Sequence, residues 1–397
     1  MSSICTDEVK IDEILTRGVH ELFTKEELKQ KLMSGKKLHL KLGTDVTGPN
    51  LHLGHTVAHR KIRDFQELGH DVTFIIGDFT TLVGDHSDKV DMRTETSADE
   101  IKRNEQRYTE QFFKTVIKSQ TKIRHNSEWL KELKFNDIIG LARQFTIAQM
   151  LERETFMLRY TEKKPIGLDE FMYPLMQGYD SVALNCDVEF GGTDQTFNLL
   201  AGRKIMQLFN QTPQCAVVTR LLTGSDGKPM GKSLMNFIPI LDNPEDMYGK
   251  VMSIVDEVIF EYFELVTRVP MDEIAQMKQE VEHGANPMEF KKRLAKEITA
   301  FYHDEKTALQ AQEYFERTVQ RGERGEKDTL EINIPENTTL LEALKTALGG
   351  EVSSGEMKRV IAQNGVSIND QIQNSMDTQI RSGDTIKFGK RKYIKIK

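Results

Sequence analysis

The chain has 397 residues, of which 38% are hydrophobic and 29% charged, and its formal net charge is −7. This composition is typical of a soluble globular protein and excludes a wholly disordered chain, and the length predicts two or three domains. No apolar run approaches the roughly 20 residues of a membrane-spanning helix, and the first residues lack the pattern of a secretory signal. The three cysteines, Cys5, Cys186 and Cys215, form no CxxC pair. We therefore expect no disulfide framework, no cysteine-rich zinc site and a cytoplasmic location.

The charge is unevenly distributed along the chain. Residues 337–397 carry 10 Lys and Arg against 6 Asp and Glu, whereas the remainder carries 44 against 55. A basic tail on an acidic body indicates a small module that binds a polyanion.

Three segments near the start predict a βαβ unit. Residues 38–43 alternate apolar and polar side chains, as a strand does, and residues 71–77 read as a buried strand. Between them, residues 56–68 have the apolar spacing of a helix and are followed by Gly69, a common helix end. Strand, helix and strand in this order predict a parallel sheet covered by helices, an α/β fold whose ligands bind beyond the carboxyl ends of the strands.

The rest of the chain alternates between helical and mixed patterns. We expect helices over 145–160 and 168–184, a short strand over 215–218, and an almost purely helical region over 244–321. Residues 321–328 are charged and glycine-containing, as an exposed linker is. The tail begins with a helix over 340–348 and ends in short strands, with turns at Asn369-Asp370 and Ser382-Gly383-Asp384.

The first chemical motif is Leu51-His52-Leu53-Gly54-His55, between a predicted strand and a predicted helix. His52 and His55 would share a face at the helix start, beside free N–H groups that attract anions. Gly54 would let a flat base approach the backbone. Taken alone, the motif is better explained by two surface histidines in a loop.

Three further motifs have polar groups at spacings that suit ligand binding. Tyr173, Gln177 and Asp180 are four and three residues apart, so they share one helix face that could line a pocket for a zwitterion with a hydroxyl group. Gly191-Gly192-Thr193-Asp194-Gln195 suits a loop against a ribose, and Lys228-Pro229-Met230-Gly231-Lys232-Ser233 suits a mobile loop over phosphates. The ordinary alternatives are a solvated helix face, a common turn and a basic surface loop.

The order of these motifs resembles that in the class I aminoacyl-tRNA synthetases, and the details resemble the bacterial tyrosyl-tRNA synthetases. The matching pieces are residues 43–47, 52–55, 84–85, 173–180, 191–198 and 229–233. Residues 365–369 and 383–387 resemble the alpha-L RNA-binding domain found at the end of such enzymes. The resemblance implies a Rossmann-like catalytic domain over 1–234, an α-helical domain over 235–325 and a small α+β RNA-binding domain over 326–397.

The resemblance also implies the ligands and a two-step reaction. Tyrosine and Mg·ATP would form tyrosyl-adenylate, and tRNA(Tyr) would then accept the tyrosyl group. The implied protein is a homodimer with residues 145–160 in the contact, without a protein-bound metal or a membrane association.

The resemblance assigns roles to individual residues. The catalytic residues would be Thr47, His52, His55 and Lys232. The nucleotide would be bound by Gly43, Asp45, His52, Gly54, His55, Gly192, Asp194, Lys228, Met230, Lys232 and Ser233. The amino acid would be bound by Lys41, Thr80, Asp85, Tyr173, Gln177, Asp180 and Gln195.

Several positions depart from the family pattern. Lys41 stands where one branch of the family has a tyrosine that binds the phenol, so Asp180 is expected to rely on another donor. Pro229 replaces the first lysine of the phosphate loop, and residues 86–88 differ from the usual sequence after Asp85. Two alternatives stay open at this point: a tryptophanyl-tRNA synthetase, and a synthetase-like RNA-binding factor without catalysis.

Overall fold

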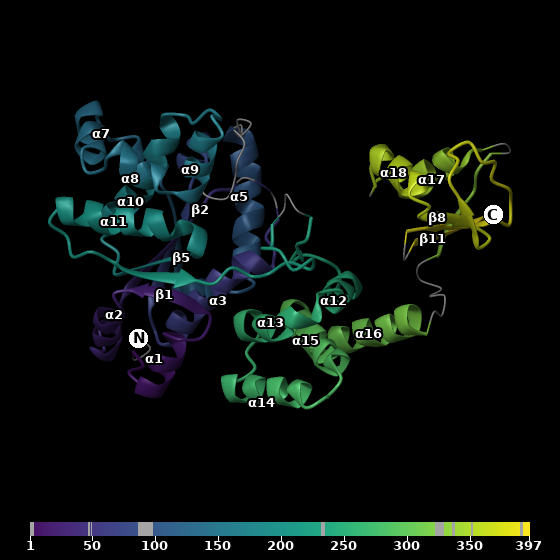
Figure 1. Cartoon of the computed structure of the whole chain (residues 1–397), viewed down its shortest axis with the longest axis horizontal. Coiled ribbons are helices and arrows are strands. Elements are labelled where there is room, and N and C mark those ends of the chain that lie inside the picture. Colours follow the sequence, from purple (N-terminus) through teal and green to yellow (C-terminus); the bar gives the residue numbers. More distant parts are fainter. Residues whose placement is uncertain are drawn as a thin grey trace. The chain divides into compact units, whose positions relative to one another are not determined.

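The structure is a computed structural model of the chain. It describes residues 4–46, 48, 50–85, 98–231, 235–321, 329–335, 338–350, 352–389 and 392–397. Two compact units are present, Met1–Leu309 and Gln310–Lys397. Figure 1 labels their helices and strands.

The first unit is built on a six-stranded sheet with the order β1-β6-β5-β2-β3-β4. Only the β1–β6 pair is antiparallel among these strands. The strands are β1 (Val19–Phe23), β2 (His39–Thr44), β3 (Asp71–Ile76), β4 (Thr121–His125), β5 (Val188–Gly192) and β6 (Cys215–Thr219). The predicted strands at 38–43, 71–77 and 215–218 are thereby confirmed, and so is the α/β fold.

The strand order reverses direction between β2 and β5. From β2 the chain continues outward to β3 and β4, whereas from β5 it continues to β6 on the other side. In a sheet of this kind, ligands bind at such a switch point, beyond the carboxyl ends of the strands.

Helices connect and cover these strands. They are α1 (Glu8–Ile14), α2 (Lys25–Met33), α3 (Leu53–Glu67), α4 (Thr80–Val83), α5 (Ala98–Phe112), α6 (Ser127–Leu130), α7 (Phe135–Ala142), α8 (Ile147–Leu151), α9 (Glu154–Thr161), α10 (Tyr173–Leu184) and α11 (Thr196–Leu208). Short 3-10 turns lie at η1 (Lys118–Gln120), η2 (Asp169–Met172) and η3 (Thr193–Gln195).

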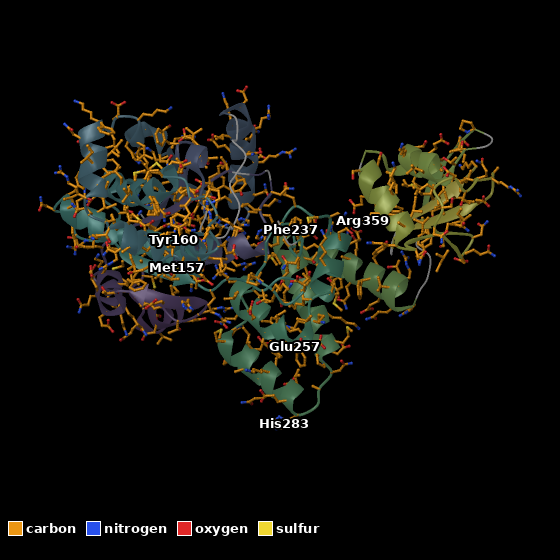
Figure 2. The ribbon with its side chains drawn as sticks, turned by 45° about the horizontal axis from the view of Figure 1, so that its top comes forward. Met157, Tyr160, Phe237, Glu257, His283 and Arg359 are labelled. Carbon is orange, nitrogen blue, oxygen red and sulfur yellow. The ribbon has the colours of Figure 1, made fainter. Side chains whose placement is uncertain are left out.

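The single helix predicted over 145–160 is wrong, because the structure has two helices there. Arg153 separates α8 from α9 with an extended ψ of 125°. Its guanidinium group lies 4.4 Å from the ring centre of Phe156 and pairs with Asp85, contacts that a sequence pattern does not show. On α9, Met157 and Tyr160, which Figure 2 labels, are 46% and 63% exposed.

A helical region follows the sheet, as expected. It contains α12 (Pro244–Met252), η4 (Asp256–Val258), α13 (Ile259–Val266), α14 (Met271–Glu282), α15 (Pro287–Tyr302), α16 (Glu305–Phe315) and the π-helical turn η5 (Glu316–Gln320).

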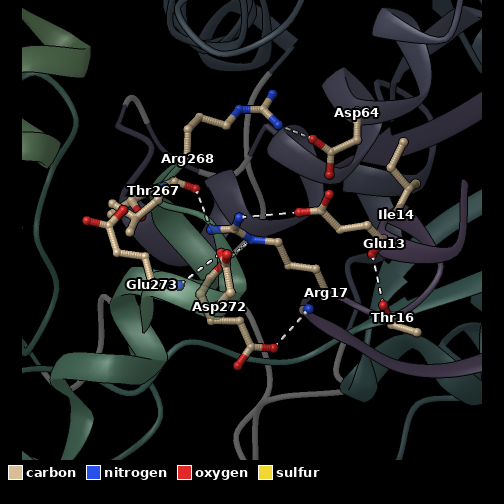
Figure 3. Close-up of polar contacts among 12 residues, drawn as sticks. Glu13, Ile14, Thr16, Arg17, Asp64, Thr267, Arg268, Asp272 and Glu273 are labelled. Atoms are coloured by element: carbon tan, nitrogen blue, oxygen red, sulfur yellow. Dashed lines mark hydrogen bonds and ion pairs between the residues drawn. The ribbon is translucent and has the colours of Figure 1, made fainter. Parts of the chain in front are cut away.

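Arg17 ties this helical region to the sheet (Figure 3). Its guanidinium group donates to the backbone oxygens of Phe263, Glu264 and Thr267, at 2.9 to 3.0 Å. The last carbonyls of a helix lack partners within it and attract cations, so Arg17 stabilises the end of α13.

The second unit has its own sheet and core. The strands β7 (Thr329–Ile332), β8 (Val366–Ile368), β9 (Gln371–Gln373), β10 (Thr385–Phe388) and β11 (Lys392–Ile396) are ordered β7-β11-β10-β8-β9. The helices are α17 (Leu340–Leu348), as predicted, and α18 (Ser354–Ala362). The predicted turns are confirmed, because Asn369, Asp370 and Gly383 have φ values of 50°, 67° and 91°. Leu344, Ile386 and Ile394 are fully buried in its core.

The described residues contain neither a candidate membrane span nor a candidate metal cluster. None of their helices is both long and apolar enough to span a membrane. No cluster of three or more His, Cys, Asp or Glu side chains with the geometry to bind a metal occurs among them.

Candidate active site

Among the residues that the structure describes, most predicted site residues lie near the ends of β2 and β5. β2 leads into the loop before α3, and β5 leads through η3 into α11. α10 packs against α11 and carries the Tyr173, Gln177 and Asp180 face.

The two histidines of the HxGH motif lie together at the start of α3. His52 is the N-cap residue, with an extended backbone, and its ring centre is 3.9 Å from that of His55. The backbone N–H of His52 donates to Nδ1 of His55 at 3.2 Å. Because this Nδ1 accepts, a neutral His55 carries its proton on Nε2 and presents a donor there.

Gly54 brings the loop that carries Met230 against the start of α3. Its N–H donates to the sulfur of Met230 at 3.3 Å, and a Cβ on Gly54 would lie 3.0 Å from Nδ1 of His52. A larger residue at position 54 would therefore displace His52 or Met230.

Asn236 shapes the loop that carries Lys228 and Met230. Its amide oxygen accepts from the N–H of Gly231 at 2.9 Å, and its amide nitrogen donates to Asp226 at 2.7 Å. That hydrogen bond lowers the pKa of the Asp226 carboxyl. The Lys228 side chain is exposed. The predictions for Thr47, Lys232 and Ser233 fall outside the described residues.

Asp180 is a buried carboxyl group, only 3% exposed. One of its oxygens, Oδ1, accepts from the indole nitrogen of Trp129 at 2.7 Å. Burial raises the pKa of Asp180 to about 7, against the lowering effects of the Lys41 charge and of the Trp129 hydrogen bond. On the same helix, burial and the charges of Asp45 and Asp85 raise the pKa of Tyr173 well above its usual value, so its phenol stays protonated.

Thr80 and Asp45 are joined in one hydrogen-bonded chain. The hydroxyl of Thr80 donates to Oδ1 of Asp45 at 2.8 Å and accepts from the amide of Asn126 at 3.1 Å. Asn126 is 1% exposed and precedes α6, the helix that holds Trp129. The chain thus links the end of β2 to the surroundings of Asp180.

Asp85 is held by groups from two other segments. Its Oδ1 lies 3.1 Å from the guanidinium group of Arg153, and its Oδ2 accepts from the amide of Gln195 at 2.7 Å. The Gln195 amide also donates to Asp194 at 2.9 Å. A Cβ on Gly192 would lie 2.5 Å from Oδ1 of Asp194, so this glycine permits the close approach of that carboxylate.

Lys41 is fully buried and is paired within the protein. Its ammonium nitrogen lies 2.9 Å from Oε1 of Glu189 and 2.8 Å from both the backbone oxygen of Gln177 and the hydroxyl oxygen of Ser181. An ammonium group has three donors, and these contacts use all three. A direct contact of Lys41 with a ligand therefore stays a prediction. Gly43, at the end of β2, has open space around it.

Sequence reasoning missed five residues of this site: Asn126, Trp129, Arg153, Glu189 and Asn198. Two signals could have found some of them. Trp129 is the one tryptophan of the chain, and Glu189 is a charge inside the otherwise apolar run of β5.

Two family models match the chain. Residues 10–320 match the tRNA synthetases class I (W and Y), and residues 331–397 match the S4 domain.

Curated relatives match over nearly the full length. The chain is 45% identical over 392 residues to the tyrosine–tRNA ligase of Dehalococcoides mccartyi (strain CBDB1), covering 98% of both chains. It is 44% identical over 391 residues to that of Moorella thermoacetica, covering 96% of this chain and 94% of the relative.

Solved structures share the fold. The tyrosyl-tRNA synthetase of Archaeoglobus fulgidus, complexed with L-tyrosine, has a TM-score of 0.63 at 21% identity, covering 76% of this chain and 100% of that one. The tyrosyl-tRNA synthetase of Aeropyrum pernix has a TM-score of 0.62 at 18% identity, covering 79% and 98%.

Proposed function

The chain belongs to the class I tyrosyl-tRNA synthetases, aminoacyl-tRNA ligases that join tyrosine to tRNA, and on this premise we propose which residues carry the reaction. The tryptophan alternative is not favoured, because the relatives named above are tyrosine–tRNA ligases over their full length.

Asp180 accepts the phenolic hydroxyl of tyrosine in this proposal. The supporting observation is a carboxyl group that is 3% exposed, on the same helix face as Tyr173 and Gln177. Phenylalanine has no hydroxyl and would leave this buried carboxylate without a ligand partner, which costs roughly 1–3 kcal/mol or more. Tyr173, Gln177 and Asp85 hold the α-ammonium group, and Thr80 lines the same site.

The nucleotide lies over the start of α3. His52 and His55 contact the phosphates of Mg·ATP together with Thr47, and Gly54 leaves room for the adenine. Gly43 and Asp45 line the nucleotide at the end of β2, while Gly192 and Asp194 hold the ribose. Lys228, Met230, Lys232 and Ser233 close over the phosphates. His52 and His55 lie at the N-terminus of α3, where free N–H groups favour anions. Their position therefore supports the placement of the ATP phosphates there.

The first step needs alignment rather than a covalent enzyme intermediate. Gln195 orients the tyrosine carboxylate, which attacks the α-phosphorus of ATP, and pyrophosphate leaves with the electrons of the broken P–O bond. His55 and Lys232 stabilise the charge that develops on the phosphate oxygens. In the second step, a terminal hydroxyl of tRNA attacks the carbonyl carbon of the adenylate and AMP leaves.

We assign the parts of the chain to these tasks as follows. Residues 1–234 form the catalytic domain, 235–325 an α-helical domain, and 326–397 a domain that binds tRNA(Tyr). The protein works in the cytoplasm.

A homodimer forms through the surface around α7, α8 and α9 in this proposal. The support is a group of exposed apolar side chains on these helices: Phe135 at 76%, Ile147 at 72%, Met157 at 46% and Tyr160 at 63%. Exposed apolar patches of this kind mark association sites. Ile147→Asp should give a monomer in sedimentation, whereas the matched change Val319→Asp, at an exposed apolar position of η5, should leave the dimer intact.

ATP–pyrophosphate exchange, run with each amino acid, tests the whole assignment. We expect stimulation by tyrosine and none by tryptophan or phenylalanine. Stimulation by tryptophan would indicate a tryptophanyl-tRNA synthetase instead. Exchange with no amino acid would favour the RNA-binding factor without catalysis.

A further inference from the structure

A buried ion pair joins the two strands at the switch point of the sheet. Lys41 on β2 and Glu189 on β5 are direct partners in the parallel register, and they are 0% and 1% exposed. Moving two charges out of water costs about as much as their attraction returns, so a buried pair is weak support for stability alone. The neighbours of this pair indicate a different role.

Glu189 is surrounded by donors. Its Oε1 accepts from Lys41 at 2.9 Å and from the side-chain amide of Gln177 at 3.2 Å. Its Oε2 accepts from Ser181 at 2.8 Å and from Gln214 at 2.7 Å. These four contacts occupy the lone pairs of an ionised carboxylate, a group that can only accept. Gly202 makes the room for them, because a Cβ there would lie 2.7 Å from the Gln214 amide nitrogen.

This arrangement decides which way the Gln177 amide points. Because Glu189 only accepts, the NH₂ end of Gln177 turns toward it. The oxygen end turns toward Asn198, whose amide donates to it at 3.1 Å and also to Gln195 at 3.0 Å. An α-ammonium group has donors only and can bind Gln177 only through this oxygen.

We infer that Lys41 and Glu189 are positioning residues of the amino-acid site: Glu189, whose carboxylate accepts from four donors, takes the NH₂ end of Gln177, so that the oxygen faces the α-ammonium group of tyrosine, and Lys41 holds this carboxylate in place through the ion pair. This inference rests on the proposed binding of the ammonium group by Gln177. A neutral partner at position 189 could donate as well as accept, and the orientation of the Gln177 amide would then be lost.

The same lysine also supports the phenol end of the site. Lys41 contacts the backbone oxygen of Gln177 and the hydroxyl of Ser181, the residues that flank Asp180 on that face of α10. Its charge lowers the pKa of Asp180 against the raising effect of burial. One buried cation thus acts on both recognition groups through contacts within the protein.

Two analogues of tyrosine separate the ammonium group from the rest of the ligand. Tyramine keeps the ammonium group and lacks the carboxylate, whereas 3-(4-hydroxyphenyl)propionate lacks the ammonium group. Their inhibition constants against tyrosine-dependent pyrophosphate exchange are measured in the full-length protein. For Lys41→Gln/Glu189→Gln we expect tyramine to lose about tenfold more affinity than the deaminated analogue, because both analogues lose the effect of Lys41 on Asp180 and only tyramine loses the oriented Gln177 oxygen.

Gln214→Met is the matched control. Gln214 donates to Oε2 of Glu189 and not to the oxygen that Gln177 contacts. This variant should therefore leave the preference between the two analogues as in the parent. Thermal unfolding shows whether the double variant is folded. If it is not, Glu189→Gln alone is the second test variant.

The outcomes separate this inference from the proposed function. If Gln177→Ala weakens tyramine binding while the Glu189 variants do not, Gln177 binds the ammonium group and our inference is wrong. If Gln177→Ala leaves tyramine binding unchanged, the role of Gln177 itself is wrong. If the Glu189 variants weaken both analogues equally, the ion pair is structural and our inference is again wrong.

Discussion

The indole nitrogen of Trp129 donates a hydrogen bond of 2.7 Å to Oδ1 of Asp180, across 51 positions of sequence. An indole N–H can only donate, so Asp180 must accept at this oxygen. The contact lowers the pKa of Asp180, which burial raises to about 7. Trp129 therefore helps to keep ionised the carboxylate that we assign to the phenol.

Removing this donor should weaken the preference for tyrosine. For Trp129→Phe, which keeps an aromatic ring, we expect the ratio of kcat/KM for tyrosine to that for phenylalanine to fall about tenfold, because one hydrogen bond to a charged group is lost. Pyrophosphate exchange with each amino acid measures the ratio. An unchanged ratio would show that Asp180 does not depend on Trp129.

Tyrosine binding should be visible in the intrinsic tryptophan fluorescence. Trp129 is the one tryptophan of the sequence and contacts Asp180 directly. We expect a saturable change in its emission when tyrosine is added and no such change in Asp180→Asn at the same tyrosine concentrations. A saturable change of equal size and midpoint in Asp180→Asn would show that the emission of Trp129 does not report a contact between Asp180 and the phenol.

The pH dependence of specificity should follow the ionisation of Asp180. Its pKa is raised from 3.8 to about 7, and an ionised carboxylate is the stronger acceptor for a phenolic hydroxyl. The preference for tyrosine over phenylalanine should thus fall as the pH is lowered through about 7. Asp180→Asn should show no such dependence. A preference in the parent that does not change with pH would contradict the assignment.

The same shift predicts a change of stability with pH. A carboxyl group with a raised pKa binds more protons in the folded than in the unfolded state. Its contribution to the free energy of unfolding is therefore present below pH 3.8 and is lost as the pH rises through about 7. Unfolding in urea at several pH values, compared between the parent and Asp180→Asn, measures this contribution. Equal pH slopes for the two proteins would mean that folding does not raise the pKa of Asp180.

Lys232 provides a test of catalysis apart from binding. If it stabilises pyrophosphate only as that group leaves, Lys232→Ala should slow adenylate formation strongly and leave tyrosine affinity almost unchanged. Pre-steady-state formation of the adenylate and equilibrium tyrosine binding measure the two effects. A comparable loss of tyrosine affinity would indicate that the loop has a structural role instead.

Local sequence patterns predicted the elements whose signals are local. Hydrophobic periodicity and apolar content within a few positions predict the strands β2 and β3 and the helix α17. Turn-forming residues predict the turns at Asn369 and Gly383. The β1 and β4 strands gave no such signal: β1 is half exposed at the sheet edge, and β4 has Ile123 as its one apolar residue.

Partners that are distant in sequence could not be read from a pattern. Glu189 pairs with Lys41 over 148 positions, and Arg153 pairs with Asp85 over 68. Such contacts depend on the strand order and on the break between α8 and α9, which tertiary packing decides. The sequence therefore predicted which residue types recognise the ligand, while the groups that orient them appear only in the fold.

The C-terminal unit should be needed for tRNA and not for the amino acid. It has its own core around Leu344, Ile386 and Ile394, so its removal should leave the first unit folded. The last residues are rich in lysine and arginine, and binding of such a segment to the tRNA backbone releases counterions. A chain ending near Arg324 should keep tyrosine-dependent pyrophosphate exchange and lose most tRNA charging at low tRNA concentration.

Salt provides the control for this truncation. Charging by the full chain should weaken with ionic strength more steeply than exchange does, because only charging depends on the polyanion. In the shortened chain, at a tRNA concentration high enough for measurable charging, the slope should become shallower as phosphate contacts are removed. Charging as efficient as that of the intact chain would show that this unit does not bind tRNA. Loss of exchange together with charging would show instead that the catalytic unit needs the tail to fold.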